Sequence, residues 1–122
     1  INGSPHKEGC TYTALSEVAA QLQKHEIETE IFWIGNQPIR GCIDCRSCWG
    51  KGRCVFDDDS VNQCIQKIIQ ADGLVVGSPV YFGGIAGGLP LMSRTFTRIS
   101  SFGHLEPFPI CSHCTAPGQD LQ

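Results

Sequence analysis

The sequence predicts an α/β domain in which parallel strands form a doubly wound sheet. Two amphipathic helical segments alternate with short apolar segments rich in β-branched residues, and glycine-rich loops follow the apolar segments. Right-handed helical crossovers between parallel strands produce such a sheet, and its ligands bind in the loops beyond the carboxyl ends of the strands. The chain has 122 residues, which is enough for one hydrophobic core, so we expect a single domain over 1–122.

The first half of the chain supplies a helix and a strand. Residues 1–5 have the pattern of an apolar strand end that runs into a tight turn, so we expect the sheet to be truncated there. β-branched and aromatic residues over 27–34 predict a short strand. Apolar residues at helical spacing predict an amphipathic helix over 11–24, and they are Leu15, Val18, Ala19 and Leu22.

The second half begins with an unusually long connection over 35–57, which has no hydrophobic periodicity. An acidic run over 57–60 precedes a second amphipathic helix that starts at Val61 and ends near Ala71. The apolar run over 74–76 predicts a parallel strand buried on both faces. We expect the last helix and strand of such a sheet to be missing, so that the domain is partial at both ends.

Composition excludes several classes of protein. Nine Lys and Arg against twelve Asp and Glu give a formal net charge of −3, without a basic stretch, which argues against nucleic acid as a partner. No apolar run reaches the roughly 20 residues of a membrane span, and the N-terminal residues lack the pattern of a signal peptide. We therefore expect a cytoplasmic protein with no membrane partner and with reduced cysteines.

Residues 3–11 form a candidate phosphate-binding loop, called the phosphate loop below. It joins a strand end to a helix N-terminus and combines hydroxyl groups, glycine and free backbone amides, which bind phosphate together with the helix dipole. The alternative is an ordinary turn in which Ser4 and Thr11 cap the helix. Dinucleotide and nucleoside-triphosphate fingerprints are absent, so a mononucleotide suits the loop best.

The loop after the apolar run 74–76 presents backbone amides beside Tyr81 and Phe82. A flat heteroaromatic ring would fit there, at the switch point of the sheet. The alternative is that both aromatic side chains cover the edge of the core.

Four cysteines lie within thirteen residues in a C-x2-C-x2-C-x5-C run: Cys42, Cys45, Cys48 and Cys54. Compact spacing of this kind can hold an iron-sulfur cluster. Two alternatives stay open, which are free thiols and a zinc site completed by a second knuckle at Cys111 and Cys114. Four cations would offset the charge of the thiolates: Arg40, Arg46, Lys51 and Arg53. Cys64 falls on the apolar face of the second helix, and we assign it to the core.

Several motifs occur together in this sequence. They are Ser-Pro-x-x-x-Gly-x-Thr from Ser4, Cys-x-x-Cys-x-x-Cys from Cys42, an Asp-Asp helix start, and Gly-Ser-Pro-Val-Tyr-Phe-Gly from Gly77. In combination they resemble the NAD(P)H-dependent FMN reductase and iron-sulfur flavoprotein group of the flavodoxin-like fold. The resemblance extends from residue 1 to about residue 96.

The resemblance implies positions for the FMN. Its phosphate would lie at Ser4, His6, Cys10 and Thr11, although His6 replaces a usual Arg and Cys10 a common Asn. The isoalloxazine would lie against Pro79, Val80, Tyr81, Phe82 and Gly83. No catalytic side chain is expected, because the flavin performs the chemistry.

The implied function is an FMN-dependent oxidoreductase that passes electrons from NAD(P)H to a small-molecule or protein acceptor. The resemblance also implies a homo-oligomer. Two alternatives stay open: an iron-sulfur flavoprotein that carries electrons through the four clustered cysteines, and a zinc-stabilised binding module.

Overall fold

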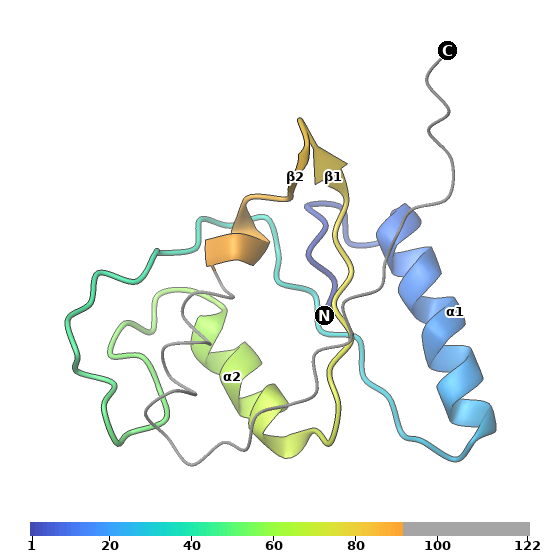
Figure 1. Cartoon of the computed structure of the whole chain (residues 1–122), viewed down its shortest axis with the longest axis horizontal. Coiled ribbons are helices and arrows are strands. Elements are labelled where there is room, and N and C mark those ends of the chain that lie inside the picture. The colour runs from blue at the N-terminus through green and yellow to red at the C-terminus, as the bar shows by residue number, and fades with distance from the viewer. Residues whose placement is uncertain (92–122) are drawn as a thin grey trace.

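A computed structural model describes residues 1–91 of the chain. The elements are α1 (Cys10–Lys24), α2 (Val61–Gln70), β1 (Val80–Tyr81) and β2 (Gly84–Ile85). In the view of Figure 1, α1 and α2 lie on either side of the segment that starts at the N-terminus. Both predicted helices are confirmed, and their ends agree with the prediction to about one residue.

Parallel pairing is centred on Asn2. This residue forms parallel bridges to Trp33 on one side and to Gly77 on the other. The Asn2 amide donates to the Phe32 carbonyl at 2.8 Å, and the Ile34 amide donates to the Asn2 carbonyl at 3.1 Å. Residue 2 therefore lies between the two apolar segments, in the order expected for a parallel α/β sheet.

Two of the predicted strands are wrong in detail. In the described part of the chain, the segment 27–34 has strand pairing only at the bridge of Trp33. The run 74–76 is not buried on both faces, because its three side chains are 41%, 46% and 42% exposed. Both segments border one groove of about 860 Å³, which leaves their side chains partly open to solvent. The full doubly wound sheet therefore stays a prediction.

A β-hairpin stands where the sequence suggested a simple loop. Val80 pairs with Ile85 and Tyr81 with Gly84 in antiparallel register. Phe82 and Gly83 form the two-residue turn, and both have positive φ, 50° and 78°. Positive φ at both central residues is the hallmark of the type I′ turn, whose twist matches that of a hairpin.

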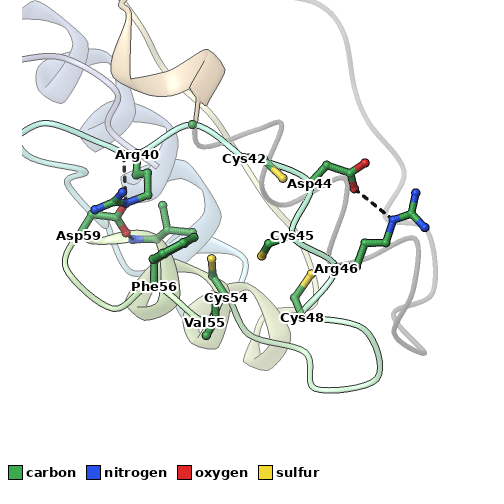
Figure 2. Close-up of a pocket in the computed structure, with 12 residues that line it drawn as sticks. Arg40, Cys42, Asp44, Cys45, Arg46, Cys48, Cys54, Val55, Phe56 and Asp59 are labelled. Carbon is green, nitrogen blue, oxygen red and sulfur yellow. Dashed lines mark hydrogen bonds and ion pairs between the residues drawn. The ribbon is translucent and has the colours of Figure 1, made fainter.

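The long connection after Ile34 has no helix or strand before the start of α2, and Figure 2 shows its part between Arg40 and Asp59 as an open loop. The predicted run of N-cap candidates ends it, but the N-cap residue Ser60 makes no side-chain cap; the Asp59 carboxylate, one residue earlier, accepts a hydrogen bond of 3.0 Å from the Val61 amide. The Ser60 hydroxyl donates to the Ile34 carbonyl at 3.0 Å. These two contacts fix the N-terminus of α2 against the end of the preceding apolar segment.

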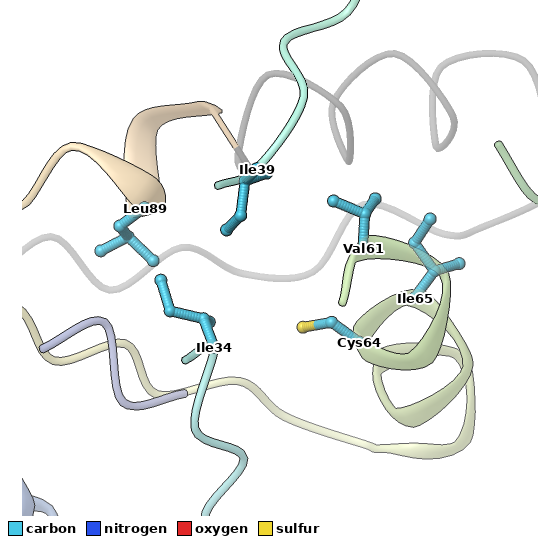
Figure 3. Close-up of a cluster of buried hydrophobic side chains, with 6 residues drawn as sticks. All are labelled: Ile34, Ile39, Val61, Cys64, Ile65 and Leu89. Carbon is cyan, nitrogen blue, oxygen red and sulfur yellow. The ribbon is translucent and has the colours of Figure 1, made fainter. Parts of the chain in front are cut away.

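In the hydrophobic core, α2 packs against the segment that contains Ile34 and Ile39 and against Leu89, which follows the hairpin (Figure 3). The buried residues of the core are Ile34, Ile39, Val61, Cys64, Ile65 and Leu89. The assignment of Cys64 to the core is confirmed, because its side chain is fully buried. Burial raises the pKa of the Cys64 thiol to about 12, so this cysteine is an unreactive apolar residue at neutral pH.

No helix in the described part of the chain has the length and apolarity needed to cross a membrane. The expectations for later residues lie outside the described range. They include the second knuckle at Cys111 and Cys114 and the closing elements of the sheet.

Candidate functional site

The phosphate loop is held in shape by two side chains from neighbouring parts of the sheet. Asn2 is completely buried; its Oδ1 accepts from the Ser4 amide and its Nδ2 donates to the Lys7 carbonyl, each at 3.0 Å. The indole Nε1 of Trp33 donates to the Ser4 carbonyl at 2.8 Å. Buried and partly buried hydrogen bonds of this kind rigidify a loop, because breaking them leaves polar groups unpaired.

The start of α1 has no side-chain cap. Its N-cap residue is Gly9, no side chain caps the helix N-terminus, and no acidic residue lies in the first turn. The Thr13 hydroxyl donates to the Gly9 carbonyl at 3.4 Å, which leaves the first amides of the helix without a side-chain acceptor. The alternative in which Ser4 and Thr11 cap the helix is therefore wrong. The hydroxyl of Ser4, itself buried, accepts instead from the His6 amide at 3.1 Å. Uncapped amides at a helix N-terminus, reinforced by the helix dipole, favour an anion.

The phosphate loop and the hairpin loop leave the sheet side by side. The Gly3 amide donates to the Gly77 carbonyl at 2.8 Å. A Cβ atom at Gly77 would lie 3.0 Å from the Thr11 methyl and 3.1 Å from Leu15, so a larger residue would push these side chains of α1 away by a few tenths of an ångström. Thr11 is half-buried there, whereas His6 and Cys10 are exposed.

The aromatic residues of the hairpin do not cover the core edge, so that alternative is wrong as well. Val80 and Tyr81 are exposed, and Phe82 at the tip is fully exposed. The Ser78 hydroxyl holds the base of the hairpin, since it accepts from the Ala86 amide at 3.0 Å. The hairpin thus presents an apolar, aromatic surface on a fixed base.

The structure brings the four clustered cysteines to one pocket, called the cysteine pocket below. Cys42, Cys45, Cys48 and Cys54 all line it, and Figure 2 shows their side chains around a common space. All four are free thiols. Within residues 1–91, no group of three or more His, Cys, Asp or Glu side chains has the arrangement of a metal site.

The thiols of the cysteine pocket differ in acidity. Hydrogen bonds from the backbone and the hydroxyl of Ser47 lower the pKa of the exposed Cys45 thiol. Desolvation, and to a smaller extent the neighbouring thiols, raise the pKa of Cys48. A thiol with a lowered pKa forms thiolate more readily, and thiolate is the form that binds metal.

The expected charge compensation by nearby cations is partly wrong, because three of the four are paired with carboxylates. Arg40 contacts Asp58 at 2.6 Å, Arg46 contacts Asp44 at 3.9 Å, and Arg53 contacts Asp57 at 3.2 Å; all six are exposed. The hydrogen bond from Arg40 also lowers the pKa of Asp58. These acidic partners reduce the net positive charge around the cysteine pocket.

Sequence reasoning missed the polar side chains that support both sites. Asn2 and Trp33 hold the phosphate loop, and Asn62 holds the backbone of Cys54. The sequence gives one indication that Asn62 is buried, because this polar residue lies directly beside the predicted core position Val61. Nothing in the sequence reveals which groups such an isolated amide contacts.

Comparison with known proteins assigns the chain to a family. Residues 1–105 match the model of NADPH-dependent FMN reductase. An iron-sulfur flavoprotein of Methanocaldococcus jannaschii is 37% identical over 92 residues, which are 75% of this chain and 47% of the relative. An iron-sulfur flavoprotein of Archaeoglobus fulgidus is 37% identical over 87 residues, or 71% of this chain and 42% of the relative.

A third relative, an iron-sulfur flavoprotein of Methanosarcina thermophila, is 34% identical over 84 residues, or 68% of this chain and 43% of the relative. The chain spans less than half the length of each of these curated relatives. No solved structure matches the chain significantly.

Proposed function

The chain belongs to the NADPH-dependent FMN reductase family, and on that premise we propose that it binds FMN and passes electrons from NAD(P)H to an acceptor. The family has the flavodoxin-like α/β fold, and the doubly wound sheet is part of the proposal. FMN, when bound, supplies hydride and single-electron transfer, whereas the protein supplies position and electrostatics.

The observation that carries this proposal is the uncapped N-terminus of α1 beside a phosphate loop held by buried and partly buried hydrogen bonds. The phosphate of FMN would be bound there by backbone amides and by Ser4, His6, Cys10 and Thr11. A preformed loop of this kind lowers the ordering cost of binding.

The adjacent hairpin would hold the isoalloxazine. The residues proposed to lie against it are Pro79, Val80, Tyr81, Phe82 and Gly83. Two observations support the proposal. The backbone hydrogen bond from Gly3 to Gly77 places the beginnings of the phosphate loop and the hairpin next to each other, and the aromatic surface of the hairpin is exposed. Flat rings are bound by such mostly apolar surfaces with a few backbone polar groups.

We further propose that the cysteine pocket holds an iron-sulfur cluster that relays electrons. Four thiols facing one pocket are the donor set that such clusters use, and the relatives described above are named iron-sulfur flavoproteins. The names of the relatives favour a cluster over the zinc site or the free thiols. The cluster would bring single-electron chemistry next to the two-electron chemistry of the flavin.

The remaining proposals concern the setting of the reaction. We propose one domain over 1–122, a homo-oligomer, a small-molecule or protein acceptor, and a cytoplasmic location. Size-exclusion chromatography with light scattering tests the oligomer, because a monomeric mass in the presence of FMN contradicts it.

Anaerobic purification followed by visible spectroscopy tests the main proposal. The expected protein is yellow-brown, releases FMN on denaturation, contains iron, and shows a broad band at roughly 400 nm that bleaches on reduction. A variant with all four pocket cysteines changed to serine should keep the flavin and lose the iron. A colourless protein that contains zinc would contradict both the flavin and the cluster.

NADH and NADPH are then compared as reductants of the bound flavin under anaerobic conditions. Bleaching of the flavin bands by either nucleotide supports the proposed donor. A flavin that is reduced by dithionite but by neither nucleotide rules the donor out.

A further inference from the structure

Asn62, in the first turn of α2, is a buried amide whose hydrogen bonds all reach the segment that closes the cysteine pocket. Its side chain is 6% exposed. Its Oδ1 accepts from the Cys54 amide at 2.8 Å, and its Nδ2 donates to the Cys54 carbonyl at 3.1 Å. Nδ2 also lies 3.0 Å from the Phe56 carbonyl and 2.8 Å from Asp57 Oδ1.

This arrangement holds the backbone of Cys54 on both sides of its Cα atom. The amide and the carbonyl of one residue bind the same carboxamide, so Cys54 cannot rotate about its backbone without breaking a partly buried hydrogen bond. Only a carboxamide has a donor and an acceptor at the required positions; an aspartate lacks the donor and a leucine lacks both.

The hydrophobic core holds the part of α2 that carries Asn62. Its helical neighbours Val61, Cys64 and Ile65 are buried in the hydrophobic core, so α2 is a rigid base for the carboxamide. Cys54 itself packs against that core, whereas Cys42 and Cys45 are exposed in the open loop. The position of the fourth thiol is therefore set by α2.

We infer that Asn62 is a positioning residue that fixes the Cys54 thiol relative to the other three thiols of the cysteine pocket. The inference rests on the proposed function, in which the cysteine pocket binds an iron-sulfur cluster. Partners that orient a metal ligand without touching the metal commonly change metal affinity by about ten- to a hundredfold when they are lost.

The test measures the rate at which an iron chelator removes iron from the anaerobically purified holoprotein, together with its FMN content. Asn62→Ala should release iron about ten- to a hundredfold faster than the wild type and keep its FMN. Gln63→Ala is the matched control, because Gln63 is the next residue of α2 and is exposed; it should release iron at the wild-type rate.

A double-variant cycle separates positioning from general loosening of the fold. If Asn62 acts through Cys54, then Asn62→Ala changes iron release by less than about twofold in a Cys54→Ser background. If Asn62→Ala yields no folded protein, Asn62→Ser is measured instead, with several-fold faster release expected.

Two results would overturn the inference while the proposed cluster stands. One is wild-type iron release in both Asn62 variants, and the other is the same acceleration with and without the Cys54 thiol. A wild-type protein that holds FMN but takes up no iron would instead overturn the proposed cluster, and the inference would fall with it.

Discussion

Trp33 and Ser4 are joined by a hydrogen bond of 2.8 Å, from the indole Nε1 to the backbone carbonyl. The bond ties the end of the segment 27–34 to the phosphate loop, although the two residues are far apart in the sequence. Ser4 is buried, so its carbonyl has little access to water as a substitute hydrogen-bond donor. The shape of the phosphate loop consequently depends on a side chain outside it.

Trp33→Phe should loosen the phosphate loop. Loss of the indole donor is expected to lower the free energy of unfolding by about 1 kcal/mol and to weaken FMN binding several-fold. Urea denaturation and a fluorescence titration with FMN measure the two effects. Trp49→Phe is the control, because Trp49 is an exposed tryptophan whose ring contacts Arg46 near the cysteine pocket. Equal FMN affinity in the two variants would contradict this role of Trp33.

Thr11→Val should weaken FMN binding without disturbing the helix contact. The valine keeps the methyl group that packs at Gly77 and removes the hydroxyl proposed to bind the phosphate. Loss of one hydrogen bond to a charged group costs about 1.5 to 3 kcal/mol, or about ten- to a hundredfold in the dissociation constant. Thr13→Val, on an exposed position of α1, is expected to bind as the wild type does. Unchanged FMN affinity in the Thr11→Val protein would contradict the proposed contact between the Thr11 hydroxyl and the phosphate.

Phe82→Asn should separate stability from cofactor binding. Phe82 has a φ of 50°, which is unfavourable for an aromatic residue and favourable for asparagine, and Asn-Gly is the preferred type I′ sequence. We expect a melting temperature equal to or above that of the wild type. The FMN dissociation constant should nevertheless rise, because the exposed aromatic ring is gone. A variant with lower stability and unchanged FMN affinity would reverse both expectations.

Stability at alkaline pH should depend on Cys64. Its pKa is about 12 in the folded protein, against 9.0 for an ordinary thiol, so the unfolded state loses this proton first. Raising the pH from about 9 to 12 therefore favours the unfolded state. In urea titrations at several pH values, Cys64→Ala should be less stable at neutral pH but show a shallower decline above pH 9. Parallel declines in the two proteins would falsify the assignment.

The helices could be predicted because their signals are local. Leu15 in α1 and Val61 to Ile65 in α2 follow the 3.6-residue period, and Asp59, in the acidic run before α2, accepts a hydrogen bond from the Val61 amide. The extent of the strands depends instead on which segments meet across the sheet. The composition of 27–34 favours a strand, but its backbone pairs only at Trp33.

The candidate sites also combine features that local sequence patterns predict with features that depend on contacts formed only on folding. The spacing of the four cysteines predicted that they would share a site, and they line one pocket. The hairpin was not predicted, because phenylalanine rarely adopts positive φ. A Phe82-Gly83 pair therefore lacks the usual sequence signal of a type I′ turn. Asn2, Trp33 and Asn62 could not be predicted in their roles, because each acts through a backbone partner that only folding brings near.

The buried Asn2 links the middle of the sheet to the proposed cofactor site. Its backbone bridges Trp33 and Gly77, and its side chain holds Ser4 and Lys7. Ligand binding and solvent protection of the central amides are therefore thermodynamically coupled. If opening of the sheet releases the ligand, saturating FMN should slow deuterium exchange at the amides of Asn2 and Gly77 by the same factor, one plus the ratio of free ligand to its dissociation constant. Binding of FMN at the surface would then be measurable as slower deuterium exchange of backbone amides in the interior of the protein.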